Sequence, residues 1–88
     1  MKAQFKASFA RDLQSIREKA TLKRIQEAIE QVEQARSLQE ITNLKKLKGG
    51  GNYYRIRIGE YRIGIIVEGD AITFVRCLHR KEIYRYFP

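Results

Sequence analysis

The folding pattern of this chain is clearest in residues 53–67, which read YYRIRIGEYRIGIIV. Isoleucines alternate with other residues on both sides of Gly59-Glu60, which is the two-residue period of β-strands. A two-residue connection that begins with glycine predicts a tight hairpin with a type II′ turn. Such a turn determines which residues pair, and it places Arg57 opposite Arg62.

The predicted hairpin has two unlike faces, because successive side chains of a strand point to opposite sides. One face is apolar and is expected to meet the helices: it carries Tyr54, Ile56, Ile58, Tyr61, Ile63 and Ile65. The other face carries Arg55, Arg57 and Arg62 with no acidic residue between them. Like charges directly opposite each other cost about 0.2–1 kcal/mol. An ordinary solvated face is one interpretation, but the single sign of charge favours a surface that binds a polyanion, because guanidinium groups bind phosphate in bidentate fashion.

Outside the hairpin, the periodicity predicts one α+β domain that spans residues 1–88. Residues 2–9 alternate loosely and predict a strand. Helical spacing follows, from a possible cap at Ser8 as far as Ala20, and then again after a possible cap at Thr21. In the connector, residues 36–51, we expect at most one helical turn and a glycine-rich loop. Residues 61–67 and 72–78 predict the second and third strands of a meander, and residues 80–88 a short terminal helix. The expected order is therefore βααβββ(α), with the N-terminal strand and a helical hairpin packed on an antiparallel sheet.

Charge and composition narrow the class of function. The 88 residues carry 18 Lys and Arg against 10 Asp and Glu, for a net charge of +8. The excess is concentrated after residue 44, and it implies a nucleic acid or an acidic protein segment as partner. The single cysteine, Cys77, excludes an intramolecular disulfide. No segment is apolar enough for a signal peptide or a membrane span, which favours a cytoplasmic protein without a membrane partner.

The C-terminal segment HRKEIYRY, residues 79–86, adds groups that could take part in chemistry. His79 is the only histidine, and both a structural and a catalytic role are open for it. Tyr84 and Tyr86 could stack on bases or pack at the terminus. Seven further basic residues could surround the arginine face: Lys45, Lys46, Lys48, Arg76, Arg80, Lys81 and Arg85. The chain has no ligand set for a metal or cofactor and no Ser-His-Asp or Cys-His signature, so the available groups suit metal-free RNA cleavage by the substrate's own 2′-hydroxyl.

Three segments together resemble the RelE/ParE superfamily of type II toxin–antitoxin toxins: LKKLKG at 44–49, YRIRIGEYRI at 54–63 and HRKEIYR at 79–85. The resemblance implies a ribosome-dependent endoribonuclease that cuts mRNA and leaves a 2′,3′-cyclic phosphate. It also implies a cognate antitoxin that wraps an acidic segment around the toxin. By the same resemblance, Arg57, Arg62, Arg80 and Tyr84 would be catalytic, and His79 is added to them as the only side chain with an unperturbed pKa near neutrality. The RNA-binding residues would be Arg55, Lys45, Lys46, Lys48, Lys81, Arg85 and Tyr86.

Two departures from the family pattern bear on the mechanism. Arg55 and Arg57 stand where the well-known nucleases carry lysine, and arginine is a poor proton acceptor, so a tyrosine or His79 is expected to act as the base. Leu78 stands where many relatives have glycine. The alternatives are a ParE-like toxin that inhibits DNA gyrase and a non-catalytic RNA-binding module. The joint presence of Arg57, Arg62 and Arg80 favours the nuclease.

Overall fold

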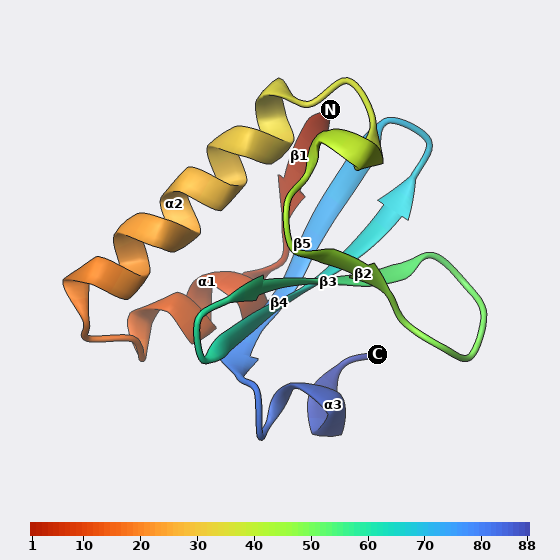
Figure 1. Cartoon of the computed structure of the whole chain (residues 1–88). Helices are drawn as coiled ribbons and strands as arrows, with labels where there is room; N and C mark the ends of the chain where they lie inside the picture. Colours follow the sequence, from red (N-terminus) through yellow and green to blue (C-terminus); the bar gives the residue numbers. More distant parts are fainter.

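A five-stranded sheet organises the computed structural model, which describes residues 1–88 (Figure 1). The strands lie in the order β1-β5-β4-β3-β2. In chain order the elements are β1 (Lys2–Phe5), α1 (Ala7–Gln14), α2 (Lys19–Gln34), the 3₁₀ turn η1 (Leu38–Glu40), β2 (Leu44–Lys46), β3 (Tyr53–Ile58), β4 (Tyr61–Glu68), β5 (Ala71–His79) and α3 (Ile83–Tyr86). The α+β class and the terminal helix are as predicted.

The hairpin β3–β4 has the predicted register. Ile58 pairs with Tyr61 and Arg57 pairs with Arg62 across the antiparallel ladder. Gly59 has a φ of 56°, whereas Glu60 has no positive φ, as a type II′ turn requires. A two-residue turn with glycine first therefore accounts for the pairing of the whole hairpin.

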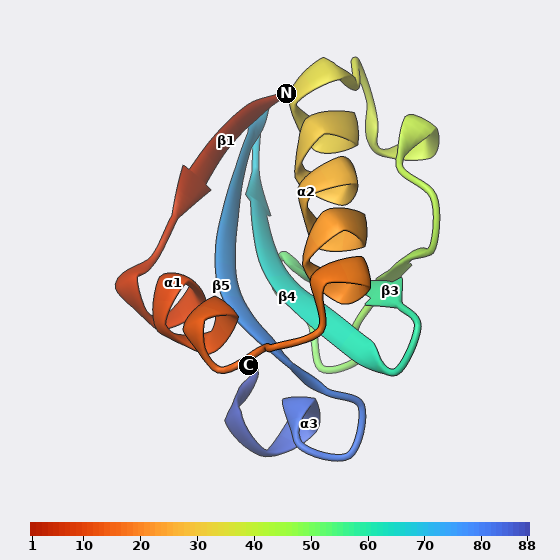
Figure 2. The ribbon, with the colours of Figure 1, turned by 90° about the vertical axis from the view of Figure 1, so that its left-hand side faces the viewer.

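The apolar face of the hairpin forms the floor of the core. Ile56, Ile58, Ile63 and Ile65 are all buried there. Helices α1 and α2 cover this face and contribute Phe9, Ile25 and Val32 to the same cluster. Figure 2 shows both helices on this side of the strands. The arginine face of the sheet therefore lies on the side away from α1 and α2.

The sheet differs from the expected one in two strands. β1 pairs parallel with β5, from Lys2 opposite Ala71 to Phe5 opposite Phe74, so the sheet is mixed rather than antiparallel. β2 was not predicted, because its three residues include two lysines and show no alternation. It pairs antiparallel with β3, and it places Lys45 beside Arg55.

The expected boundaries in the N-terminal half are wrong. The first strand ends at Phe5 and α1 begins at Ala7, so Ser8 lies inside the helix and does not cap it. α1 ends at Gln14, and α2 begins at Lys19, which places Thr21 in its first turn. The Thr21 hydroxyl donates to the Glu18 carboxylate at 3.3 Å, and it does not accept from a backbone amide as a helix cap would.

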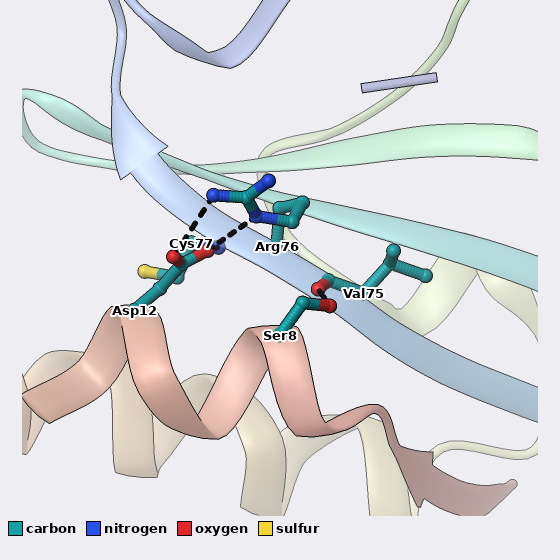
Figure 3. A network of polar contacts seen from close by, with 5 residues as sticks. All are labelled: Ser8, Asp12, Val75, Arg76 and Cys77. Carbon is teal, nitrogen blue, oxygen red and sulfur yellow. Dashed lines mark hydrogen bonds and ion pairs between the residues drawn. The ribbon is translucent and has the colours of Figure 1, made fainter. Parts of the chain in front are cut away.

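Tertiary contacts explain why α1 begins so early. β1 pairs only with residues 71–74, so the rest of β5 has no strand beside it on that side. The Ser8 hydroxyl donates to the carbonyl of Val75, and the Asp12 carboxylate accepts from the amide of Cys77 at 2.9 Å (Figure 3). Asp12 also accepts two bonds from the Arg76 guanidinium, at 2.7 and 3.0 Å. Two side chains one helical turn apart thus satisfy the backbone groups that β1 leaves free.

Candidate nucleic-acid interface

The three arginines predicted to share a face are held there by neutral acceptors. Arg55 donates to the backbone oxygen of Asn43 at 2.9 Å, and Arg57 reaches the side-chain oxygen of the same residue at 3.4 Å. Arg62 donates to the carbonyls of Gly59 and Tyr61 at 2.8 and 2.9 Å. The three ion pairs of the structure involve other residues. Their positive charges are therefore oriented but not neutralised by a carboxylate.

The electrostatics of Arg62 show how closely the basic groups gather. Partial burial lowers the pKa of its guanidinium below the usual value, and the charge of Arg55 lowers it further. Tyr84 acts in the opposite direction, and Arg57 and Arg80 again lower the pKa. Like charges disfavour the protonated form, so an anion bound here would relieve the repulsion between these arginines.

Arg80 is the one predicted catalytic arginine with an acidic partner. Its Nε lies 2.8 Å from a carboxylate oxygen of Glu60, and both side chains are more than half exposed. The Arg80 amide also donates to the Glu60 carbonyl at 2.8 Å. Arg80 is thereby held at the turn of the hairpin, next to Arg62.

Helix α3 brings Tyr84 to the arginine face. The helix has only four residues, but the buried side chains of Ile83 and Phe87 anchor it on either side of Tyr84. The Phe87 ring lies over Gly64, where an added Cβ would come within 2.5 Å of it, and meets Tyr53 edge to face. Gly64 pairs with Arg55, so this contact places α3 on the arginine side of the sheet. Tyr84 is 59% exposed there.

His79 and Tyr86 lie apart from this group. His79 pairs with Tyr61, whose side belongs to the helix-covered face, and the two rings meet edge to face at 5.9 Å. Its Nδ1 accepts the amide hydrogen of Lys81 at 3.2 Å. The Tyr86 ring lies 5.3 Å from the Arg76 guanidinium carbon, on the side toward α1. Neither side chain is placed beside Arg62: His79 adjoins the hairpin through its pair with Tyr61, but on the face opposite to the arginines.

The remaining predicted RNA-binding residues fall into two groups. Lys45, Lys46 and Lys48 line a hollow of about 320 Å³ together with Leu47, Tyr84, Phe87 and Pro88. Lys81 and Arg85 are exposed near α3, and Arg85 lies 3.9 Å from Glu82. The lysines in and just after β2 thus extend the basic surface from the arginines toward α3.

Three contributors to the site were not found from the sequence. Asn43 accepts hydrogen bonds from two arginines, and its backbone has a positive φ of 61°. An asparagine before a short strand only weakly indicates such a conformation. Glu60 looked like a turn residue only. Gly64 within a strand is a known sign of close approach by another group, and it could have pointed to the Phe87 contact.

Two further features of the residues bear on function. No three His, Cys, Asp or Glu side chains come together in a way that could hold a metal ion. None of the helices has the length and apolar character needed to cross a membrane.

Comparisons with known proteins agree with this geometry. The family model for the ParE toxin of the type II toxin–antitoxin system parDE matches residues 3–84. The toxin RelE3 of Methanocaldococcus jannaschii is 49% identical over 89 residues, which cover all of both chains.

Solved structures show the same likeness. The structure titled as the RelB–RelE antitoxin–toxin complex from Methanococcus jannaschii contains a chain that is 48% identical, with a TM-score of 0.82 over 97% of this chain and 99% of that one. A chain of the archaeal RelE–RelB complex from Pyrococcus horikoshii is 26% identical, with a TM-score of 0.74 over 93% and 97%. Together with the family match, these likenesses establish that the chain belongs to the RelE/ParE superfamily, as a RelE-type toxin of a type II toxin–antitoxin system.

Proposed function

We propose that the protein is a metal-independent endoribonuclease that cleaves mRNA on the ribosome. The observation that carries the proposal is the shared face of Arg55, Arg57 and Arg62, whose charges have no carboxylate partner. A phosphodiester supplies the anionic oxygens that such a cluster lacks, and guanidinium groups match its geometry. The family membership supports the same reading, because a RelE-type toxin is expected to act on mRNA.

The proposed reaction needs no nucleophile from the protein. The 2′-hydroxyl of the substrate loses its proton and attacks the adjacent phosphorus, the bond to the 5′-oxygen breaks, and that oxygen gains a proton. The products are a 2′,3′-cyclic phosphate and a free 5′-hydroxyl. Arg57, Arg62 and Arg80 stabilise the negative charge that builds up on the phosphoryl oxygens. This stabilisation lowers the activation free energy most when the donors are already oriented before the reaction.

We assign the removal of the proton from the 2′-hydroxyl to a group at or near Tyr84. Tyr84 lies close enough to Arg62 to raise the pKa of its guanidinium, and its side chain is exposed to an incoming substrate. His79 would have to leave its contacts with Tyr61 and the Lys81 amide to reach the same point. The RNA on either side of the cut is bound by other basic and aromatic residues, of which Arg55, Lys45, Lys46 and Lys48 lie nearest and Lys81, Arg85 and Tyr86 lie farther along α3.

The proposed partners follow from charge and from the relatives. The two most similar structures described above are titled as complexes of RelE with RelB, so a cognate antitoxin is the expected partner in a hetero-oligomer. An acidic segment of that antitoxin would complement the net charge of +8. Ribosome and mRNA as partners place the activity in the cytoplasm.

The second candidate is inhibition of DNA gyrase. It is favoured by the description of the matching family, which names the ParE toxin. It needs a binding surface but no oriented phosphate site, so it leaves the three arginines without a task. Gyrase inhibition would appear as DNA damage signalling in cells, without cuts in mRNA.

The test uses two arginines and a matched control. Arg57→Ala and Arg62→Ala are compared with Arg17→Ala, which removes an exposed arginine from the turn between α1 and α2. Primer extension on a reporter mRNA with purified ribosomes should show codon-phased cuts for the wild type and the control. Loss of one oriented donor should slow cleavage about 10²–10³-fold. Folding stability should stay the same or rise by about 0.2–1 kcal/mol, because a like-charged pair is removed. Full cleavage by both variants would mean that the site is wrong.

A further inference from the structure

The chain enters β2 through Asn43, the only residue other than glycine with a positive φ, at 61°. Residues with a Cβ adopt this left-handed conformation rarely, and they keep it where the surrounding structure determines it. Both neighbours of Asn43 are fixed. Before it, the amide and the hydroxyl of Thr42 each donate to the side chain of Gln31 in α2 at 3.1 Å. After it, Leu44 pairs with Ile56 of β3, so the backbone direction is set by an anchor on each side.

The left-handed backbone of Asn43 presents two oxygens to the arginines of β3. Its carbonyl oxygen accepts from the backbone amide of Arg57 at 3.1 Å and from Nη1 of Arg55 at 2.9 Å. Its side-chain oxygen Oδ1 accepts from Nη2 of Arg57 at 3.4 Å. One residue thus bonds to both guanidinium groups and to the strand that carries them. Arg62, in contrast, is held by carbonyls of its own hairpin.

Both oxygens of Asn43 are neutral, which is important for arginines that are to bind a phosphate. A carboxylate here would neutralise the guanidinium groups and compete with the substrate, whereas a carbonyl or amide oxygen orients them and leaves their charge. A guanidinium has several N–H donors in one plane, so it can bind Asn43 with one nitrogen and a phosphate with the others. An ammonium group has no such fixed fork, so the oxygens of Asn43 suit arginine in particular.

We propose that Asn43 is a positioning residue of the cleavage site, which holds the guanidinium groups of Arg55 and Arg57 toward the scissile phosphate before the RNA binds. Asn43 itself does not touch the substrate. The assignment rests on the proposed function and deepens it, because donors that are oriented beforehand need no reorganisation during the reaction. A solely structural asparagine would turn the chain into β2 without any effect on these two side chains.

Two substitutions separate orientation from folding. Asn43→Gly keeps the positive φ without strain and keeps the backbone carbonyl, so it removes only the contact between Oδ1 and Arg57. Asn43→Asp keeps the shape of the side chain but adds a carboxylate beside both guanidinium groups. Asn52→Gly is the matched control, because Asn52 is the only other asparagine and is likewise exposed. Circular dichroism and urea melts verify that each protein is folded.

The first measurement follows the arginine side chains by NMR, without any substrate. It reports how fast each guanidinium group rotates about its Cζ–Nη bonds, and a hydrogen bond slows this rotation. We expect Asn43→Gly to speed up the rotation in Arg57 and to leave Arg62 as in the wild type, whereas Asn52→Gly should change neither. Asn43→Asp should slow the rotation in Arg57. Unchanged rotation of Arg57 in Asn43→Gly would overturn the positioning role.

The second measurement is cleavage of reporter mRNA on ribosomes, with kcat and KM determined separately. Loss of one hydrogen bond that orients Arg57 should lower kcat about 2–10-fold and change KM less than about twofold. In the background of Arg57→Ala, Asn43→Gly should have no further effect, because Oδ1 has already lost its partner. A fall in kcat of the same size with and without Arg57 would indicate a role in folding only, and it would overturn the proposal.

The third measurement tests the need for a neutral oxygen. Short RNA in which every 2′-hydroxyl is methylated cannot be cleaved by this reaction, and its binding is followed by fluorescence polarisation. Asn43→Asp should bind it up to about fivefold more weakly than the wild type, because the new carboxylate competes for the same guanidinium groups. Equal or tighter binding by Asn43→Asp would contradict the requirement for a neutral acceptor.

These measurements distinguish failure of the positioning role from failure of the proposed function. If the wild type does not cleave mRNA while Asn43→Gly frees the guanidinium of Arg57, the nuclease proposal is wrong and Asn43 still orients the arginine. If the wild type cleaves mRNA while Asn43→Gly changes neither the rotation of Arg57 nor kcat, the positioning role alone is wrong.

Discussion

The contact between Gly64 and Phe87 is expected to be sensitive to a single methyl group. A Cβ at Gly64 would lie 2.5, 2.6 and 2.8 Å from three ring carbons of Phe87. The ring cannot yield locally, because it is only 2% exposed and meets Tyr53 edge to face at 5.6 Å. We therefore expect Gly64→Ala to displace Phe87 and with it α3.

The size of the effect follows from the burial of the ring. Overpacking of a filled site costs about 1–3 kcal/mol, and loss of a fully buried phenylalanine side chain from its site costs a similar amount. We expect Gly64→Ala to lower the free energy of unfolding by about 2 kcal/mol. In a domain of this size, that corresponds to roughly 8–16 °C in Tm.

A double-mutant cycle tests whether Phe87 is the cause. Phe87→Ala alone should cost about 3–5 kcal/mol. In that background Gly64→Ala should cost less than about 0.5 kcal/mol, because the ring is gone and alanine is the better residue in a strand. Urea unfolding of the four proteins measures the coupling. If Gly64→Ala costs the same with and without Phe87, or costs nothing in the wild type, the proposed anchoring of α3 is incorrect.

Three further changes have outcomes that the structure determines. Asp12→Asn should lower the free energy of unfolding by about 2–4 kcal/mol in urea melts, because Arg76 loses the carboxylate of an ion pair whose two side chains are only 24% and 10% exposed; a loss below 0.5 kcal/mol would contradict this. Glu60→Gln should leave stability within about 1 kcal/mol but raise the affinity for uncleavable RNA up to about fivefold, since Arg80 no longer has a competing carboxylate; weaker binding would argue against the role of Arg80. Burial, with a smaller effect of Asp12, raises the pKa of the Cys77 thiol to about 12. The folded protein should therefore resist alkylation by iodoacetamide at pH 8, and the unfolded chain should react. Because the unfolded thiol ionises near 9.0, its contribution to stability is present below that pH and is lost as the pH rises from 9 toward 12; Cys77→Ala should remove that part of the alkaline loss.

The hairpin could be predicted because its determinants are local. Two residues, Gly59 and Glu60, define the turn, and the alternation on either side determines which side chains share a face. That was enough to place Arg55, Arg57 and Arg62 together, and the structure confirms this grouping. The chemistry of the cluster remains a proposal, because the grouping does not by itself establish a reaction.

The predictions that failed did so because of contacts between residues that are distant in sequence. Serine is a residue type that often caps helices, but the Ser8 hydroxyl donates to the carbonyl of Val75, 67 residues away. β2 depends on its ladder with β3 and has little strand character of its own. His79 belongs to the strand beside the arginine hairpin, but its pairing with Tyr61 places its side chain on the helix-covered face. Local patterns do not contain this information.

The side chains of α1 have a consequence for aggregation, because they cover a part of β5 that no strand covers. An edge strand with free backbone groups can pair with a strand of another molecule, and such pairing leads to aggregation. The part of β5 beyond residue 74 has no strand beside it on the β1 side. Here Ser8 and Asp12 already occupy the backbone groups of Val75 and Cys77 to which a foreign strand would bind. The part of β5 that β1 does not cover is thus closed by a helix instead of by a longer strand.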